Sequence, residues 1–87
     1  MTYQLEGLAR VREWLAAEED RQERDVLREW LVALARDPHA QEAMPVPGIA
    51  APVFACFVPG SNVVVTYLIA EQYHVVRIIE IASLLAP

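Results

Sequence analysis

Three apolar segments in the last third of the chain constrain its fold more than any other feature. They span residues 53–58, 63–70 and 74–82, and each has the length of a β-strand. Successive side chains of a strand point to opposite faces of a sheet. In the second segment the two faces carry Val63, Val65, Tyr67 and Ile69 against Val64, Thr66, Leu68 and Ala70. In the third they carry Val75, Arg77, Ile79 and Ile81 against His74, Val76, Ile78 and Glu80. A sheet built from these segments is therefore apolar on both faces.

Two amphipathic segments ahead of the strands predict helices at about residues 5–18 and 21–36. Their apolar side chains recur every three or four positions: Leu5, Leu8, Val11 and Leu15 in the first, and Leu27, Trp30, Leu31 and Leu34 in the second. This spacing places each set on one face of its helix. We expect Trp14 and Trp30 to lie in or beside the interface between the helices and the sheet.

The ends of these helices carry boundary signals of unequal strength. Asp20 is placed to cap the second helix, and Glu23 stands three residues later, as in a capping box. Pro38 prevents this helix from continuing. The start of the first helix is less defined because Gly7 weakens it, and a short edge strand over residues 1–5 is the alternative.

The connections between segments predict how the strands pair. Residues 38–52 contain several prolines and form a long irregular connection from the helices to the sheet. The link at residues 59–62 reads Pro-Gly-Ser-Asn, a strong hairpin signal, and the link at 71–73 is equally short. Short links imply an antiparallel meander. We therefore predict a single α+β domain over residues 1–87, with a helical hairpin packed on a three- to four-stranded antiparallel sheet.

Two helices can cover only one face of such a sheet. The other face requires a partner protein, a second copy of the chain in a homodimer, or tolerance of exposed apolar surface. The formal net charge is −5, with seven arginines and no lysine. Direct binding to nucleic acid is disfavoured, because such binders usually present a basic face.

The sequence predicts no metal site and no cofactor. His39 and His74 are far apart, and Cys56 has no second cysteine to complete a zinc site. A lone thiol in an apolar strand is typical of a reducing cytosol. No signal peptide and no run long enough to span a membrane is visible, so we expect a cytoplasmic protein.

Arg77 is the charge that most invites a functional interpretation, because it interrupts an apolar strand. One interpretation is a rim residue that either extends its charged end outward into solvent or pairs with Glu80 or Glu71 across the turn. The other is a phosphate or carboxylate contact on the uncovered sheet face.

The order of these motifs resembles the RelE/ParE superfamily of bacterial toxins from type II toxin–antitoxin systems. The matching features are the step Leu34-Ala35-Arg36-Asp37-Pro38, the proline-rich loop, the apolar run 63–69 with Tyr67, and the last strand, residues 75–81. The resemblance implies a toxin whose sheet face is wrapped by an antitoxin. In a ParE-like member the target is gyrase, and in a RelE-like member it is mRNA on the ribosome.

The chain departs from the ribonuclease pattern of the superfamily. RelE-type members use basic side chains on the sheet. At the three corresponding places this chain has no basic side chain: residues 53–58, Val64 and residues 82–84. Phosphoryl transfer without cations loses its main source of charge stabilisation. We therefore expect a toxin-family protein that acts by protein binding. There are two alternatives. The first is a ribosome-dependent endonuclease with an atypical site, in which Arg77 contacts phosphate and the Tyr67 hydroxyl is a positioning group on the same face. The second is a non-toxic dimerisation module.

Overall fold

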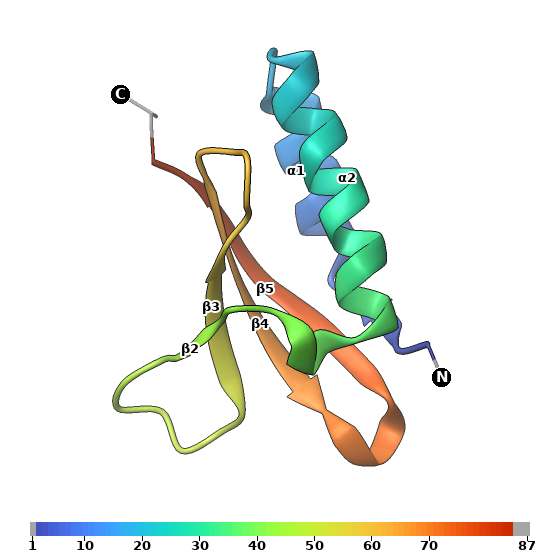
Figure 1. The fold of residues 1–87 in the computed structure, drawn as a ribbon, viewed down its shortest axis with the longest axis vertical. Helices are drawn as coiled ribbons and strands as arrows, with labels where there is room; N and C mark the ends of the chain where they lie inside the picture. Colours follow the sequence, from blue (N-terminus) through green and yellow to red (C-terminus); the bar gives the residue numbers. More distant parts are fainter. Residues whose placement is uncertain (1, 85–87) are drawn as a thin grey trace.

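A five-stranded sheet carries two helices on one of its faces (Figure 1). The computed structural model describes residues 2–84. In chain order the elements are β1 (Gln4–Glu6), α1 (Leu8–Ala17), α2 (Arg21–Arg36), the 3₁₀ helix η1 (Pro38–Ala40), β2 (Met44–Pro45), β3 (Val53–Phe57), β4 (Val63–Ala70), the 3₁₀ helix η2 (Glu71–Tyr73) and β5 (Val75–Ser83). The predicted α+β class is confirmed.

The strand order is β1-β5-β4-β3-β2. The pairs from β2 to β5 are antiparallel, as the short links predicted, and β1 pairs with β5 in parallel. The sheet therefore has five strands where an antiparallel sheet of three or four was predicted, because the short strands β1 and β2 extend the meander at its two edges. None of the described helices is long and apolar enough to cross a membrane.

The N-terminal segment resolves into a strand followed by a helix. Gln4–Glu6 form the edge strand β1, and α1 begins at Leu8 where position 5 was expected. The boundary is Gly7, whose left-handed φ of 80° takes the chain out of the strand. Of the proposed edge strand 1–5, residue 1 lies outside the described residues.

The second helix has the predicted limits. Asp20 caps it by accepting hydrogen bonds from the backbone N–H groups of Gln22 and Glu23, at 2.9 and 3.4 Å. The capping box is not completed, because the Glu23 carboxylate accepts instead from the backbone and side-chain amides of Asn62, at 2.9 and 3.2 Å. This contact ties the start of α2 to the β3–β4 hairpin.

The core lies between the helices and one face of the sheet, here called the inner face. Its buried members are Val11, Leu27, Trp30, Leu31 and Leu34 from the helices and Cys56, Val58, Val63, Val65, Tyr67, Ile69, Val76 and Ile78 from the sheet side. Trp30 is buried and Trp14 is partly buried against this cluster, so both lie where the sequence placed them. Cys56 is a small buried core residue.

A β-bulge changes the predicted faces of the last strand. Thr66 pairs with Glu80 while Tyr67 pairs with Ile78, so Ile79 has no partner on β4. Strict alternation placed Ile79 and Ile81 on one face. The extra residue instead leaves Ile79 exposed and turns Ile81 to the inner face, where it packs against the core.

Candidate functional site on the uncovered sheet face

The two described α-helices lie on one side of the sheet (Figure 1). The opposite face, here called the outer face, is covered by neither of them and carries mostly apolar strand residues. Its strand residues are Val53, Ala55 and Phe57 of β3, Val64, Thr66, Leu68 and Ala70 of β4, and Val75, Arg77, Ile79, Glu80 and Ala82 of β5. Phe57 is 49% exposed and Ile79 is 37% exposed. Such a surface is typical of a protein interface.

Arg77 is the one arginine on the described strands, and it lies on the outer face. Its guanidinium donates from Nε and Nη2 to Oε1 of Glu6, at 3.2 and 2.9 Å. The parallel pairing of β1 with β5 places Glu6 opposite Arg77. The expected pairing with Glu80 or Glu71 is therefore wrong. An anion that binds Arg77 must compete with a carboxylate already there.

A hollow of about 440 Å³ lies over this ion pair. Its lining consists of Glu6, Leu68, Ala70, Tyr73, Val75 and Arg77. The walls are mainly apolar, and the two charges neutralise each other. This arrangement suits a protein side chain better than a polyanion, which requires an excess of cations.

Tyr67 does not share the outer face with Arg77, and this expectation is wrong. Tyr67 has no exposed surface, and its ring lies in the core at 6.0 Å from that of Trp30 and 6.1 Å from that of Phe54. Its hydroxyl has no hydrogen-bond partner among the described residues. Burial raises the pKa of Tyr67 to about 12. A hydroxyl in this position cannot contact a ligand on the outer face.

We expect Tyr67→Phe to leave the protein equally stable, or to stabilise it by about 0.5–1.5 kcal/mol, because a buried hydroxyl without a partner costs free energy. Urea unfolding followed by circular dichroism measures the change. Tyr3→Phe is the comparison, since the Tyr3 hydroxyl donates to Glu71 and its removal should not stabilise. A loss of more than 1 kcal/mol in Tyr67→Phe would contradict this description of the core.

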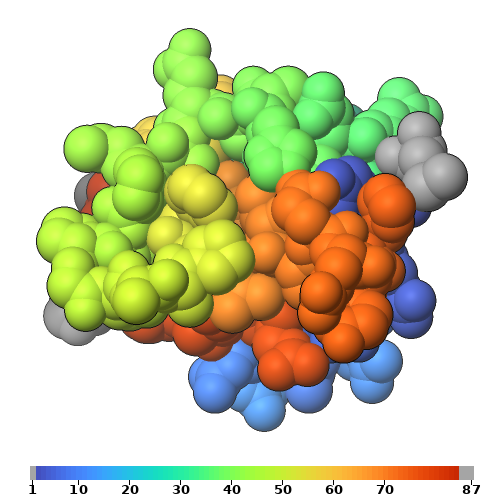
Figure 2. Space-filling view, turned by 90° about the horizontal axis from the view of Figure 1, so that it is seen from below, coloured from blue at the N-terminus to red at the C-terminus, as the bar shows by residue number. Residues whose placement is uncertain are grey.

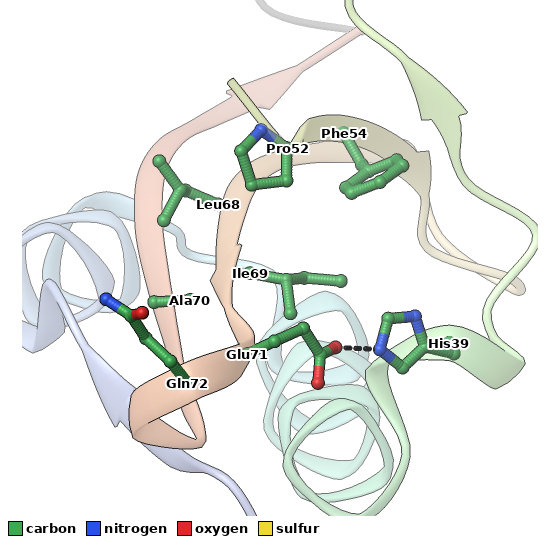
Figure 3. A pocket seen from close by; sticks show the side chains of 8 residues that line it. All are labelled: His39, Pro52, Phe54, Leu68, Ile69, Ala70, Glu71 and Gln72. Atoms are coloured by element: carbon green, nitrogen blue, oxygen red, sulfur yellow. Dashed lines mark hydrogen bonds and ion pairs between the residues drawn. The ribbon is translucent and has the colours of Figure 1, made fainter.

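A second hollow, of about 490 Å³, lies where β4 ends, between η1 and η2 (Figure 3). Its lining consists of His39, Pro52, Phe54, Leu68, Ile69, Ala70, Glu71 and Gln72. Figure 2 views the molecule from this end, with the yellow-green loop before β3 and the orange η2 turn at the surface. We call this hollow the β4-end cavity.

Glu71 at the mouth of the β4-end cavity is the centre of a polar cluster. Its Oε2 accepts from the Tyr3 hydroxyl at 2.8 Å, and its Oε1 interacts with Nε2 of His39. The hydrogen bond from Tyr3, followed by that from His39, lowers the pKa of Glu71 below its usual value. The Tyr3 ring also lies 5.2 Å from that of His74. The sequence did not indicate this cluster, because its members are distant along the chain.

The described residues contain no group of three or more His, Cys, Asp or Glu side chains arranged to hold a metal ion. The rings of both histidines approach Tyr3, and among the described residues Glu71 is the acid that contacts the imidazole of His39, while the Asp37 carboxylate accepts from the His39 backbone N–H. The residues that line the two hollows offer apolar contact, hydrogen bonding and ion pairing.

Comparison of the fold with solved structures gave three close matches in shape. The toxin–antitoxin complex RelBE2 from Mycobacterium tuberculosis matches with a TM-score of 0.76 and 17% identity, over 95% of this chain and 92% of that chain. The isolated E. coli RelE toxin matches with a TM-score of 0.72 and 17% identity, over 98% of this chain and 87% of that one. A free-state mutant of E. coli RelE matches with a TM-score of 0.68 and 21% identity, over 95% and 84%.

A scan against protein-family models and a search of curated proteins by sequence gave no match. The chain therefore has the fold of RelE toxins, which confirms the architecture expected from the resemblance. At these identities the likeness establishes the fold alone.

Proposed function

We propose that this chain is a single-domain cytoplasmic toxin of a toxin–antitoxin system, and that it acts by binding proteins through its outer face. The observation that carries the proposal is an uncovered apolar sheet face on a RelE-like fold. One of the similar structures is itself a complex of a toxin with an antitoxin. The partner we propose is an antitoxin that covers the outer face.

The energetics of the outer face favour a tight partner. Burial of about 600 Å² of apolar surface at about 25 cal/mol per Å² would supply about 15 kcal/mol before the cost of association is subtracted. Phe57 and Ile79 are exposed large side chains that would contribute to this burial. A homodimer that uses the same face is the state we expect in the absence of the partner.

The charges of the outer face argue against ribonuclease chemistry. Arg77 is its one cation among the described residues, and Glu6 already engages it. Loss of a single charge-stabilising donor typically lowers a rate by about 10²–10³. A site that lacks several donors would therefore work near the background rate, so a protein target such as gyrase fits the surface better than mRNA.

Expression of the chain in growing bacteria tests the proposal. We expect growth arrest while mRNA 5′ ends remain unchanged, and we expect Phe57→Glu to abolish the arrest because it places a charge in the apolar face. Val32→Glu is the matched control, because Val32 is 55% exposed on α2, away from the outer face. A DNA-supercoiling assay with purified gyrase then tests the first target.

Two results would contradict this mechanism. Codon-phased mRNA cleavage that disappears in Arg77→Ala would establish the alternative, a ribosome-dependent endonuclease with an atypical site. Absence of any growth effect would leave the non-toxic dimerisation module as the remaining interpretation. In that case light scattering should find a dimer that Phe57→Glu dissociates and Val32→Glu does not.

A further inference from the structure

We propose that the β4-end cavity anchors a segment of a partner protein in which an arginine or lysine stands next to a large apolar side chain. This inference rests on the proposed function, because it identifies where a protein partner is held. The inference goes beyond the proposed function because it assigns a binding site to the region around His39 and Glu71. It also states the chemistry of the segment that fits there.

The walls of the β4-end cavity select an apolar group. Phe54, Leu68 and Ile69 line it together with Pro52 and Ala70 (Figure 3). Its volume of about 490 Å³ falls within the range of sites that hold small ligands. The hollow is open toward solvent, so an apolar side chain laid against these walls would keep the neighbouring residue of its segment at the mouth.

The mouth of the cavity selects a cation. A carboxylate offers about four acceptor positions, and Tyr3 and His39 each engage one oxygen of Glu71, so further positions remain. The lowered pKa of Glu71 keeps it ionised at neutral pH. None of the described residues that line the cavity is an arginine or a lysine. With the histidines counted as neutral, the chain carries a net charge of −5, which favours a basic segment and disfavours an acidic one.

The cavity is also continuous with the outer face. Leu68 and Ala70 line both the β4-end cavity and the hollow over the Arg77–Glu6 pair. A partner that crosses the outer face can therefore pass over the end of β4 and place its basic residue beside Glu71. This continuity favours a protein segment over a free small molecule.

Titration of the isotope-labelled full chain with Nα-acetyl-leucyl-arginine amide tests the proposal by NMR. We expect saturable shifts of the backbone amides of residues 69–72. The same dipeptide with citrulline, which is neutral and of similar shape, should bind about two- to fivefold more weakly, because the attraction between the guanidinium charge and the Glu71 carboxylate is lost. Acetyl-glycyl-arginine amide should also bind more weakly, since it lacks the apolar side chain.

Two variants assign the effect to Glu71. Glu71→Gln should remove the preference for arginine over citrulline, while it retains an acceptor for Tyr3. Glu29→Gln makes the same charge change on the exposed surface of α2 and should leave the preference intact. Absence of saturable shifts, equal affinity for the two dipeptides, or shifts confined to Glu6 and Arg77 would overturn the proposal.

These outcomes separate the cavity from the toxin mechanism. Dipeptide binding at residues 69–72 in a chain that causes no growth arrest would contradict the proposed function and support the cavity. Growth arrest that depends on Phe57, in a chain that shows no saturable shifts, would support the function and refute the cavity.

Discussion

Trp30→Ala is expected to destabilise the protein by about 3–5 kcal/mol, since it removes a large side chain from a closed core. Trp30 is only 7% exposed, packs against the ring of Tyr67, and donates from Nε1 to Oε1 of Gln41 at 3.1 Å. A domain of this size has a total stability of only several kcal/mol. The Tm of the variant should therefore fall by about 12–40 °C, which thermal circular dichroism measures directly.

Two further variants separate the contributions of Trp30. Trp30→Phe keeps most of the apolar volume and loses the bond to Gln41, so it should cost about 1–2 kcal/mol. Val32→Ala on the same helix removes an exposed side chain and should change stability by about 0.5 kcal/mol or less. If Trp30→Ala melts within a degree or two of the parent, the packing of α2 described above is incorrect.

The sequence predicted the elements that are set by local periodicity. The apolar spacing in α2 and the alternation in β4 each require one face to be buried, and in the structure Leu27, Leu34 and Tyr67 are fully buried. The Asp20 cap and the stop before Pro38 were predictable because they depend on neighbouring residues.

The remaining features depend on pairing between distant segments. β1 exists because Gln4–Glu6 find the edge of β5, more than 60 residues away along the chain. The bulge at Ile79 depends on how β5 is aligned with β4, and no residue type near Ile79 indicates that β5 has one unpaired residue there. An alternation rule applied to one strand cannot detect either feature.

In the candidate sites too, features that depend on local sequence were predictable and features that depend on distant segments were not. Arg77 was identified from sequence because a charge within an apolar strand is conspicuous, yet its partner Glu6 depends on β1. The misplacement of Tyr67 has a different origin. Periodicity divided β4 correctly into two sets, and only the packing of the helices decides which set becomes the inner face. The link from Tyr3 through Glu71 to His39 requires three separate segments to meet.

Gly7→Ala is expected to destabilise the protein by about 2–4 kcal/mol through two separate effects. Gly7 has a φ of 80°, a left-handed conformation that costs a residue with a Cβ about 1–2 kcal/mol. A Cβ on Gly7 would also stand 2.3 Å from the backbone oxygen of Ile78, so the strand edge or the start of α1 would have to move. Urea unfolding measures the total effect.

Gly60→Ala isolates the contribution of the contact with Ile78. Gly60 has nearly the same φ, 82°, but among the described residues, its two chain neighbours aside, no atom lies within 4 Å of the Cβ that alanine would add. Its substitution should therefore cost only the conformational part, about 1–2 kcal/mol. The difference between the two variants measures how tightly the chain passes the edge of β5 as it leaves β1. Equal losses would show that α1 does not start against this edge, and the position of Glu6 beside Arg77 would then have to be revised as well.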